Sequence, residues 1–291
     1  MISPGELREA LADKRLRLLD VRWALGDPDG PQHYLAGHIP RAVFVDLETE
    51  LAAPPSPARG RHPLPDLAQL EKCARSWGLC EGDPVVVYDA TGGMAAARAW
   101  WLLRWAGIAD VRILDGGLPG WIAAGGPVAT GAETDPEPGD VVLSPGHLPV
   151  IDADAAARWK GVLLDARASE RFRGDVEPID PRAGHIPGAL SAPTADNLDA
   201  EGRFRAAEEL RERFAGFGSG PVAVYCGSGV TAAHQVAALA VAGLEAALYP
   251  GSWSQWSNDP KRPVATRSKH PPAPRRVKQE TVVAGRPPRT V

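Results

Sequence analysis

The same ordered set of short motifs occurs twice in this chain, and this repeat constrains the fold more than any other feature. Leu18-Leu-Asp-Val-Arg22 in the first half corresponds to Leu163-Leu-Asp-Ala-Arg167 in the second, and Gly-His-Ile-Pro follows in both halves. Order and spacing agree over most of each half, and the period is much longer than a solenoid repeat. Each copy is therefore predicted to be a complete domain.

Short apolar strands alternate with helical segments in each copy. Residues 85–88 and 222–225 are rich in strand formers, and Ala-rich helices are predicted over 95–105 and 230–242. This alternation predicts an α/β fold with two tandem domains, each a mainly parallel sheet with helices on both faces.

Two further helices are predicted in the first copy. Residues 8–16 form an amphipathic segment, and residues 66–77 form a second one with Asp66 as N-cap and Gly78 as its stop.

Shifts in composition predict the domain boundaries. The first domain is predicted over 1–130, a polar Pro/Gly linker over 131–140 and the second domain over 141–266. Residues 267–291 are basic and Pro-rich with little apolar content, which predicts a disordered tail.

Charge and cysteine content limit the classes of partner. The net charge of −4 favours neither nucleic acid nor a membrane surface, and no apolar run is long enough to span a bilayer. The N-terminus lacks the pattern of a signal peptide, and the odd count of three cysteines does not make a disulfide framework. We therefore expect a cytoplasmic protein. His and Cys do not cluster at ligand spacing, so no metal is expected.

Cys226 stands in a glycine-bearing loop between a predicted strand and a predicted helix. Such a loop is an anion-binding nest, and the positive end of the helix dipole adds to it, so both favour the nucleophilic thiolate. Gly227 and Gly229 allow backbone angles that other residues resist, while Ser228 and Thr231 supply hydroxyl donors. The alternative is a buried, inert cysteine at a strand end. Two glycines and two hydroxyls around one sulfur favour the nucleophile.

A phosphatase loop is a second reading of this cysteine. Protein tyrosine phosphatases need Cys-x5-Arg, because a bidentate guanidinium holds the phosphate dianion. Ala232 stands at the position of that arginine, and the loop contains no Lys or Arg. Phosphate-ester hydrolysis is therefore disfavoured.

Taken together, Asp-x-Arg, Gly-His-Ile-Pro-Gly-Ala and a strand ending in Cys-x-x-Gly-x-Thr, in a tandem copy, resemble the two-domain rhodanese family of sulfurtransferases. The resemblance extends to Val264 and implies a non-catalytic first domain and a catalytic second domain. In such enzymes a cysteine takes sulfur from a small-molecule donor as a persulfide and passes it to a thiol or cyanide, with no cofactor. Asp89 stands in place of the nucleophile in the first copy, so that domain is expected to brace the second and line the cleft between them. A thioredoxin-like reductant is a further expected partner.

The resemblance also bears on the sulfur donor. Thiosulfate-preferring members tend to carry basic residues where Ser228 stands, whereas Cys-Gly-Ser-Gly-Val-Thr is typical of members that prefer 3-mercaptopyruvate. The backbone N–H groups from Gly227 through Val230 to Thr231 are expected to hold the thiolate, the persulfide and the anionic oxygens of the donor. Thiosulfate is the alternative donor, and a non-catalytic module for binding or sulfur carriage is the rival from another class.

Four residues outside the loop match site positions of the family. Arg171 matches the arginine that binds the substrate carboxylate, and Arg182 is a substitute for a second arginine that does not align. Glu48 and His62 match an acid–histidine pair that works with the loop serine. A surface histidine in a Pro-rich loop is the alternative for His62, and the sequence leaves the two open.

Other polar residues are predicted to be structural. The Asp-x-Arg motif occurs in both copies, including the copy without a cysteine, which favours an ion pair that supports the fold. His234 is predicted to be a packed or solvated side chain, and Trp253 is predicted to wall the cleft.

Overall fold

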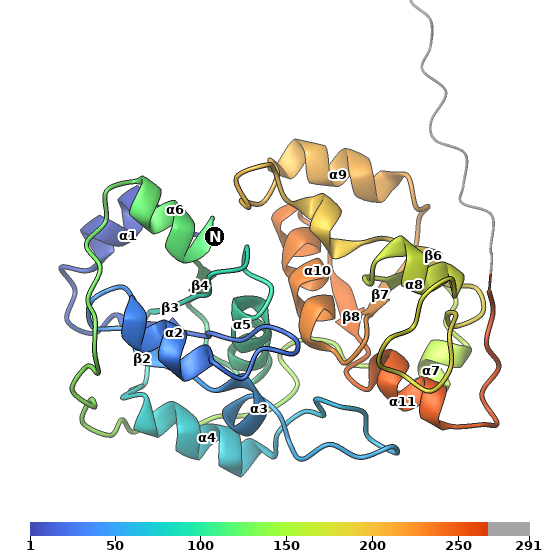
Figure 1. The fold of residues 1–291 in the computed structure, drawn as a ribbon, viewed down its shortest axis with the longest axis horizontal. Helices are drawn as coiled ribbons and strands as arrows, with labels where there is room; N and C mark the ends of the chain where they lie inside the picture. Colours follow the sequence, from blue (N-terminus) through green and yellow to red (C-terminus); the bar gives the residue numbers. More distant parts are fainter. Residues whose placement is uncertain (267–291) are drawn as a thin grey trace, which may run out of the picture.

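The computed structural model describes residues 1–266, which form two parallel four-stranded sheets side by side (Figure 1). The predicted basic tail over 267–291 lies outside the described residues. The first sheet has the order β2-β1-β3-β4 and the second has the order β6-β5-β7-β8. The strands are β1 (Arg17–Asp20), β2 (Val43–Phe44), β3 (Val85–Tyr88), β4 (Val111–Ile113), β5 (Val162–Asp165), β6 (Leu190–Ser191), β7 (Val222–Tyr225) and β8 (Ala246–Leu248). The predicted fold class is confirmed.

The register of the two sheets repeats along with the motifs. Leu18 pairs with Val86 between β1 and β3, and Leu163 pairs with Ala223 between β5 and β7. The residues of β3 and β5 are all buried. Helices cover both faces of a parallel sheet, which explains why its central strands are apolar throughout.

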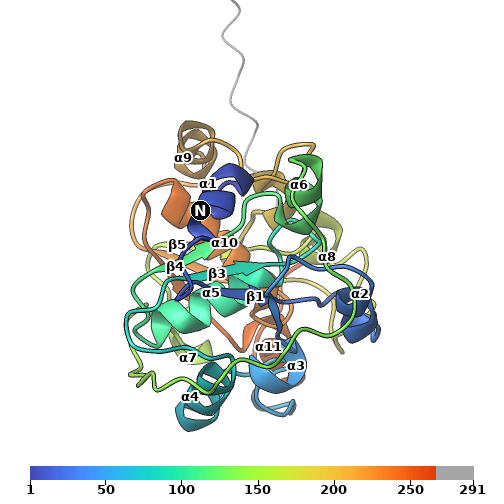
Figure 2. The same ribbon diagram turned by 90° about the vertical axis from the view of Figure 1, so that its left-hand side faces the viewer.

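Helices cover each sheet on two sides, as Figure 2 shows for the first domain, which faces the viewer. In the first domain they are α1 (Pro4–Ala10), α2 (Gly30–Ala36), α3 (Leu47–Glu50), α4 (Leu67–Ser76), α5 (Ala96–Trp105) and α6 (Gly117–Ala123). In the second they are α7 (Ala153–Ala157), α8 (Ser169–Arg173), the 3-10 helix η1 (Thr194–Asn197), α9 (Ala207–Ala215), α10 (Val230–Val241) and α11 (Ser252–Asn258). Within residues 1–266, no helix has the length and apolar character needed to cross a bilayer.

Local signals decide where two of these helices begin. The side chain of Asp66 accepts a hydrogen bond from the N–H of Ala68, so the predicted N-cap of α4 is confirmed. The prediction of a helix over 8–16 is wrong, because α1 begins at Pro4 and ends at Ala10. Ser3 and Glu6 form a reciprocal capping box that fixes this earlier start.

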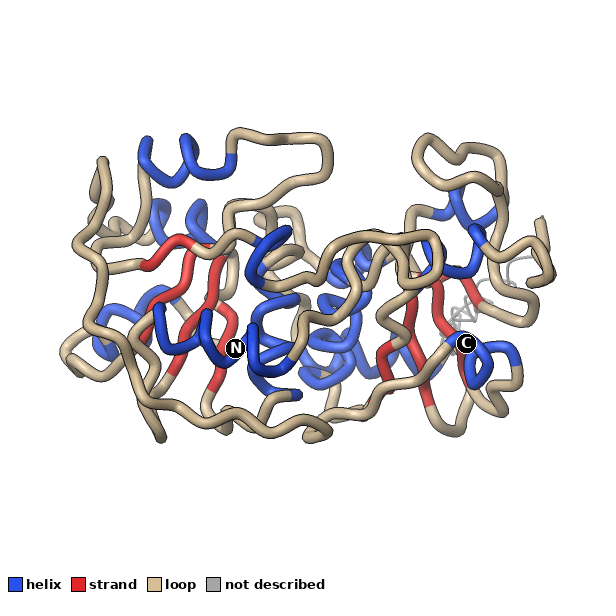
Figure 3. The backbone as a smooth tube through the Cα atoms, turned by 90° about the horizontal axis from the view of Figure 1, so that it is seen from below, coloured by secondary structure: helices blue, strands red, loops and turns tan. Residues whose placement is uncertain are grey.

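The two domains meet along α5 and α10, which pack against each other between the sheets (Figure 3). Each of these helices follows the strand and loop that correspond in the two copies. Their small alanine side chains allow a close approach, and one continuous apolar core runs through both domains. The loop at Asp89 and the loop at Cys226 therefore lie at the start of the two helices that form the interface.

The repeated Asp-x-Arg motif forms a buried ion pair in both domains, as predicted. Arg22 lies 2.7 Å from Asp20, and Arg167 lies 2.6 Å from Asp165. Each arginine also donates to the carbonyl of the glycine in the Gly-His-Ile-Pro motif of its own domain. The histidine that follows this glycine is buried and stacks on an aromatic ring in both copies. These motifs therefore connect β1 and β5 to the following turns and support the fold.

Candidate active site

Cys226 lies at the carboxyl end of β7, and its side chain is buried with 1% exposed. Its Sγ accepts a hydrogen bond from the N–H of Gly229 at 3.1 Å. Gly229 has φ of +82° and immediately precedes α10, so glycine is favoured there for its left-handed backbone. The N–H of Cys226 donates to Oγ of Ser252 at 3.1 Å, which anchors the start of the loop to α11.

The corresponding loop of the first domain holds an anion of its own. The carboxylate of Asp89 accepts hydrogen bonds from four backbone N–H groups at the start of α5. The donors are Thr91, Gly93, Ala95 and Ala96, at 2.8–3.0 Å. A strand–loop–helix unit of this shape therefore forms an anion-binding nest, and the second copy presents the sulfur of Cys226 at the corresponding position.

A cavity of about 330 Å³ opens onto Cys226 between the two domains. The first domain contributes Trp23, Leu25, Arg61 and Met94. The second domain contributes Ala166, Arg167, Ala168, Arg171, Pro193, Thr194, Ala195, Cys226, Gly227, Ser228, Val230 and Thr231. The expected cleft lined by both domains is therefore present, and five of its residues come from the predicted loop.

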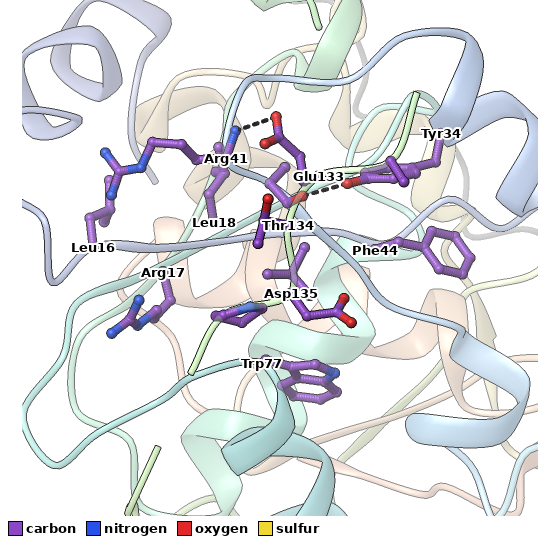
Figure 4. Close-up of a pocket in the computed structure, with 14 residues that line it drawn as sticks. Leu16, Arg17, Leu18, Tyr34, Arg41, Phe44, Trp77, Glu133, Thr134 and Asp135 are labelled. Atoms are coloured by element: carbon purple, nitrogen blue, oxygen red, sulfur yellow. Dashed lines mark hydrogen bonds between the residues drawn. The ribbon is translucent and has the colours of Figure 1, made fainter. Parts of the chain in front are cut away.

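A larger cavity, of about 510 Å³, lies beneath the linker that joins the domains (Figure 4). Arg41, Tyr34 and Glu133 lie along it, and the N–H of Arg41 donates to the Glu133 carboxylate at 2.9 Å. Among the described residues that line it, none is a cysteine or a histidine. The chemistry predicted for Cys226 is therefore assigned to the smaller cavity.

Ser228 and His62 are brought together across the domain interface. Nδ1 of His62 lies 2.7 Å from Oγ of Ser228, and both side chains are buried. Burial lowers the pKa of His62 to about 4, and the charges of Arg98 and Arg61 act in the same direction. The imidazole is therefore neutral near pH 7 and can accept the hydroxyl proton of Ser228. The alternative of a surface histidine does not fit this buried position.

Glu48 does not lie against His62, so a direct acid–histidine pair is not formed. Its exposed carboxylate accepts a hydrogen bond from Nε1 of Trp23 at 3.1 Å. The indole of Trp23 meets the imidazole of His62 edge to face, with ring centroids 5.4 Å apart. Trp23 therefore lies between Glu48 and His62 and contacts both residues.

Two arginines from different domains lie at the mouth of the cavity. Arg171 lines the cavity from the second domain, and Arg61 lines it from the first. Arg171 lies 2.6 Å from Glu177 and 3.2 Å from Asp180, and Arg61 also pairs with Asp180. The Nε atoms of both arginines are buried without a hydrogen-bond partner among the described residues. Arg61 is not predicted by any motif, although it directly precedes His62 in the sequence.

Arg182 was predicted as a second substrate-binding arginine, but it is not among the residues that line the cavity. Its guanidinium donates to four backbone carbonyls at and beyond the end of α11. The acceptors are Trp256, Ser257, Asp259 and Arg262, at 2.6–2.9 Å. Trp253 is likewise part of the core, with its Nε1 bonded to the carbonyl of Arg182 and the guanidinium of Arg167 over its ring. Both residues support the fold of the second domain.

Neither of the other two cysteines lines this cavity. Cys73 is buried in α4 and Cys80 is partly exposed before β3, and both are free thiols. Within residues 1–266, no group of three His, Cys, Asp or Glu side chains is arranged to hold a metal ion. Cys226 is the cysteine that lines the cavity.

Known proteins are similar to this chain over nearly its whole length. A family described as "Rhodanese-like domain" matches residues 3–124 and 151–259. A Mycobacterium tuberculosis protein, provisionally named a thiosulfate sulfurtransferase, is 50% identical over 91% of this chain and 96% of its own length. A Pseudomonas aeruginosa protein, provisionally named a 3-mercaptopyruvate sulfurtransferase, is 49% identical over 91% of this chain and 98% of its own.

Solved structures agree with these sequence matches. The 3-mercaptopyruvate sulfurtransferase SseA of Escherichia coli superposes with a TM-score of 0.76 and 35% identity, over 87% of this chain and 98% of that one. The 3-mercaptopyruvate sulfurtransferase of Leishmania major superposes with a TM-score of 0.78 and 31% identity, over 88% of this chain and 73% of that one.

Proposed function

This chain belongs to the rhodanese family of sulfurtransferases, and we propose that it moves sulfane sulfur from 3-mercaptopyruvate to a thiol or cyanide through a persulfide on Cys226. The observation that carries this proposal is the position of the Cys226 sulfur. It is held by the N–H of Gly229, in a cavity that both domains line, beside the Ser228–His62 pair and three arginines. A nucleophile, a proton path and an anion-binding group are thus within one small site.

The first half of the reaction forms the persulfide. The thiolate of Cys226 attacks the donor sulfur, so an S–S bond forms while the carbon–sulfur bond of 3-mercaptopyruvate breaks. The bonding electron pair stays on the carbon, and the resulting pyruvate enolate takes up the proton that the donor thiol loses. Ser228 and neutral His62 provide a path for that proton, and the loop N–H groups, including those of Val230 and Thr231, stabilise the negative charge.

The second half returns the sulfur to an acceptor. A nucleophile attacks the outer sulfur of the persulfide, the S–S bond breaks, and Cys226 leaves as a thiolate. Cyanide becomes thiocyanate and a thiol becomes a persulfide. A thioredoxin-like dithiol would end as a disulfide with release of sulfide. Three free cysteines support a reducing, cytoplasmic location for these acceptors.

The charge at the mouth of the cavity supports a donor with one negative charge. Arg61, Arg167 and Arg171 are paired with Asp165, Glu177 and Asp180, so three cations are balanced by three carboxylates. A carboxylate of 3-mercaptopyruvate needs one such clamp, whereas the thiosulfate dianion gains more from unpaired cations. Ser228 also stands where a basic residue would favour thiosulfate. The name of the Mycobacterium tuberculosis relative keeps thiosulfate as the second candidate donor.

The proposal is tested by measuring thiocyanate formed from cyanide with 3-mercaptopyruvate and with thiosulfate as parallel donors. Wild type is compared with Cys226→Ser and with Cys80→Ser, which changes a thiol outside the cavity. We expect a higher kcat/KM with 3-mercaptopyruvate, lost in Cys226→Ser and retained in Cys80→Ser. A higher kcat/KM with thiosulfate would overturn the donor assignment, and no turnover with either donor would favour a sulfur-carrier or binding module.

A further inference from the structure

Arg98 is a fully buried cation that joins the first domain to the loop of Cys226. It lies on α5, and its guanidinium donates to four backbone carbonyls at 3.0–3.3 Å. Three of these carbonyls belong to the first domain and the fourth belongs to the catalytic loop. The acceptors are Leu51, His62, Pro63 and Gly229.

The charge of Arg98 is not matched by a carboxylate in the described part of the chain. Among residues 1–266, the ion pairs do not include Arg98, whereas the other buried arginine near the cavity, Arg167, pairs with Asp165 and Glu177. Burial lowers the pKa of Arg98 to about 10, and negative charge on Cys226 acts in the opposite direction. The guanidinium is therefore charged at neutral pH. A buried charge without a counter-ion is costly, and negative charge on the Cys226 sulfur would offset part of that cost.

Gly229 connects this cation to the sulfur. Nη1 of Arg98 lies 3.3 Å from the Gly229 carbonyl oxygen, and the N–H of the same residue donates to Sγ of Cys226. Arg98 also binds the carbonyl of His62, so one guanidinium fixes both the nest and the histidine that contacts Ser228. A shift of Arg98 would therefore move both parts of the site.

The corresponding contact in the opposite direction, from α10 of the second domain to the Asp89 loop of the first, is made by an uncharged side chain. His234 on α10 reaches back to the first domain, where its Nε2 lies 3.2 Å from the carbonyl of Gly92. Burial lowers the pKa of His234 to about 4, so this imidazole is neutral near pH 7. The loop it contacts already contains the carboxylate of Asp89. The buried side chain that reaches the Asp89 loop from the other domain is therefore a neutral imidazole, whereas the one that reaches the Cys226 loop is a cation.

We propose that Arg98 is a positioning residue for sulfur transfer, which fixes Gly229 and favours the anionic form of the Cys226 sulfur from inside the first domain. The inference rests on the proposed function, in which that sulfur is the nucleophile. Other charged groups also face Cys226, but they differ from Arg98 because they form ion pairs. Arg61, Arg167 and Arg171 line the cavity, and each pairs with Glu177 or Asp180. His62 is neutral near pH 7, and α11 contributes the uncharged Ser252.

The test is the rate of Cys226 alkylation by iodoacetamide as a function of pH, read by mass spectrometry of the peptide that contains Cys226. This readout needs no sulfur transfer, so it is independent of the donor and of turnover. In Arg98→Met we expect the midpoint of the profile to rise by about one pH unit, since removal of a nearby opposite charge disfavours the thiolate. Arg104→Met, a matched change on the same helix outside the cavity, is expected to keep the wild-type midpoint. A wild-type midpoint in folded Arg98→Met would overturn the proposal.

Arg98→Lys keeps the test decisive if the methionine variant does not fold. Lysine retains the charge, but its ammonium cannot serve four carbonyls of two domains at once. We expect the alkylation midpoint to stay near the wild-type value and kcat for thiocyanate formation to fall about 10-fold, because Gly229 is no longer fixed. Wild-type kcat in this variant, or an alkylation midpoint raised as far as expected for Arg98→Met, would overturn the positioning role.

Discussion

Nδ1 of His62 and Oγ of Ser228 lie 2.7 Å apart, although the two residues belong to different domains and are separated by 166 positions. The contact exists because α5 and α10 dock the two domains with the loops of Asp89 and Cys226 at the interface. The first domain has no cysteine at the position of Cys226, yet it contributes the histidine and one arginine of the proposed site. Catalysis by the second domain alone is therefore not expected.

Replacement of His62 should affect the two donors differently. His62→Gln removes the proton acceptor of Ser228, and we expect kcat with 3-mercaptopyruvate to fall about 100-fold, which is the scale of general acid–base catalysis. Thiosulfate releases sulfite, which needs no proton on carbon, so its kcat should fall much less. Steady-state kinetics with both donors measure the difference. An equal loss with both donors would indicate that His62 only supports the loop.

Arg61 and Arg182 offer a matched pair of arginine substitutions. Arg61→Met removes a cation from the mouth of the cavity, and we expect KM for 3-mercaptopyruvate to rise about 10- to 100-fold with a small change in kcat, as for the loss of a charged hydrogen bond of about 1.5–3 kcal/mol. Arg182→Met should leave KM unchanged and lower the unfolding midpoint in urea, because it frees four carbonyls at the end of α11. The opposite pattern in these two variants would restore the assignment made from sequence.

Asp89 should contribute to stability and not to turnover. Asp89→Ala leaves four backbone N–H groups at the start of α5 without their acceptor. We expect a loss of about 2–4 kcal/mol in the free energy of unfolding, since buried unsatisfied donors cost about 1–3 kcal/mol each and water can reach part of the loop. Urea unfolding measures this loss. An unchanged unfolding free energy would contradict the nest described for this loop.

His234 should make the protein less stable in acid. Its pKa is lowered to about 4 by burial, whereas an unfolded histidine titrates near 6.5, so the unfolded state binds more protons between these values. Stability from His234 is present above the unfolded pKa and is lost as the pH falls toward 4. Urea unfolding at pH 7 and pH 5 should show a smaller difference for His234→Gln than for wild type. Equal differences in the two proteins would exclude this contribution.

Much of the fold can be predicted from the sequence because its signals are local. β7 and α10 were expected at nearly their observed bounds, since strand formers, a glycine and an alanine-rich helix follow one another directly. The same local order placed Cys226 in a nest. The start of α1 is also encoded locally, because Ser3 and Glu6 have the spacing of a capping box, whereas the amphipathic pattern over 8–16 predicts a later start.

The sequence alone determined the tandem α/β fold, the sulfur nucleophile and Arg171 beside it, because these depend on neighbours in the chain and on motifs in a fixed order. Only the tertiary structure decided that Arg61 and not Arg182 faces the cavity, that Glu48 contacts Trp23, and that Arg98 lies behind the loop. These choices depend on how two apolar helix faces dock and which polar groups are desolvated between them. Burial and distance across an interface are properties of the packed molecule, so residues more than 100 positions apart acquire their roles only when the domains meet.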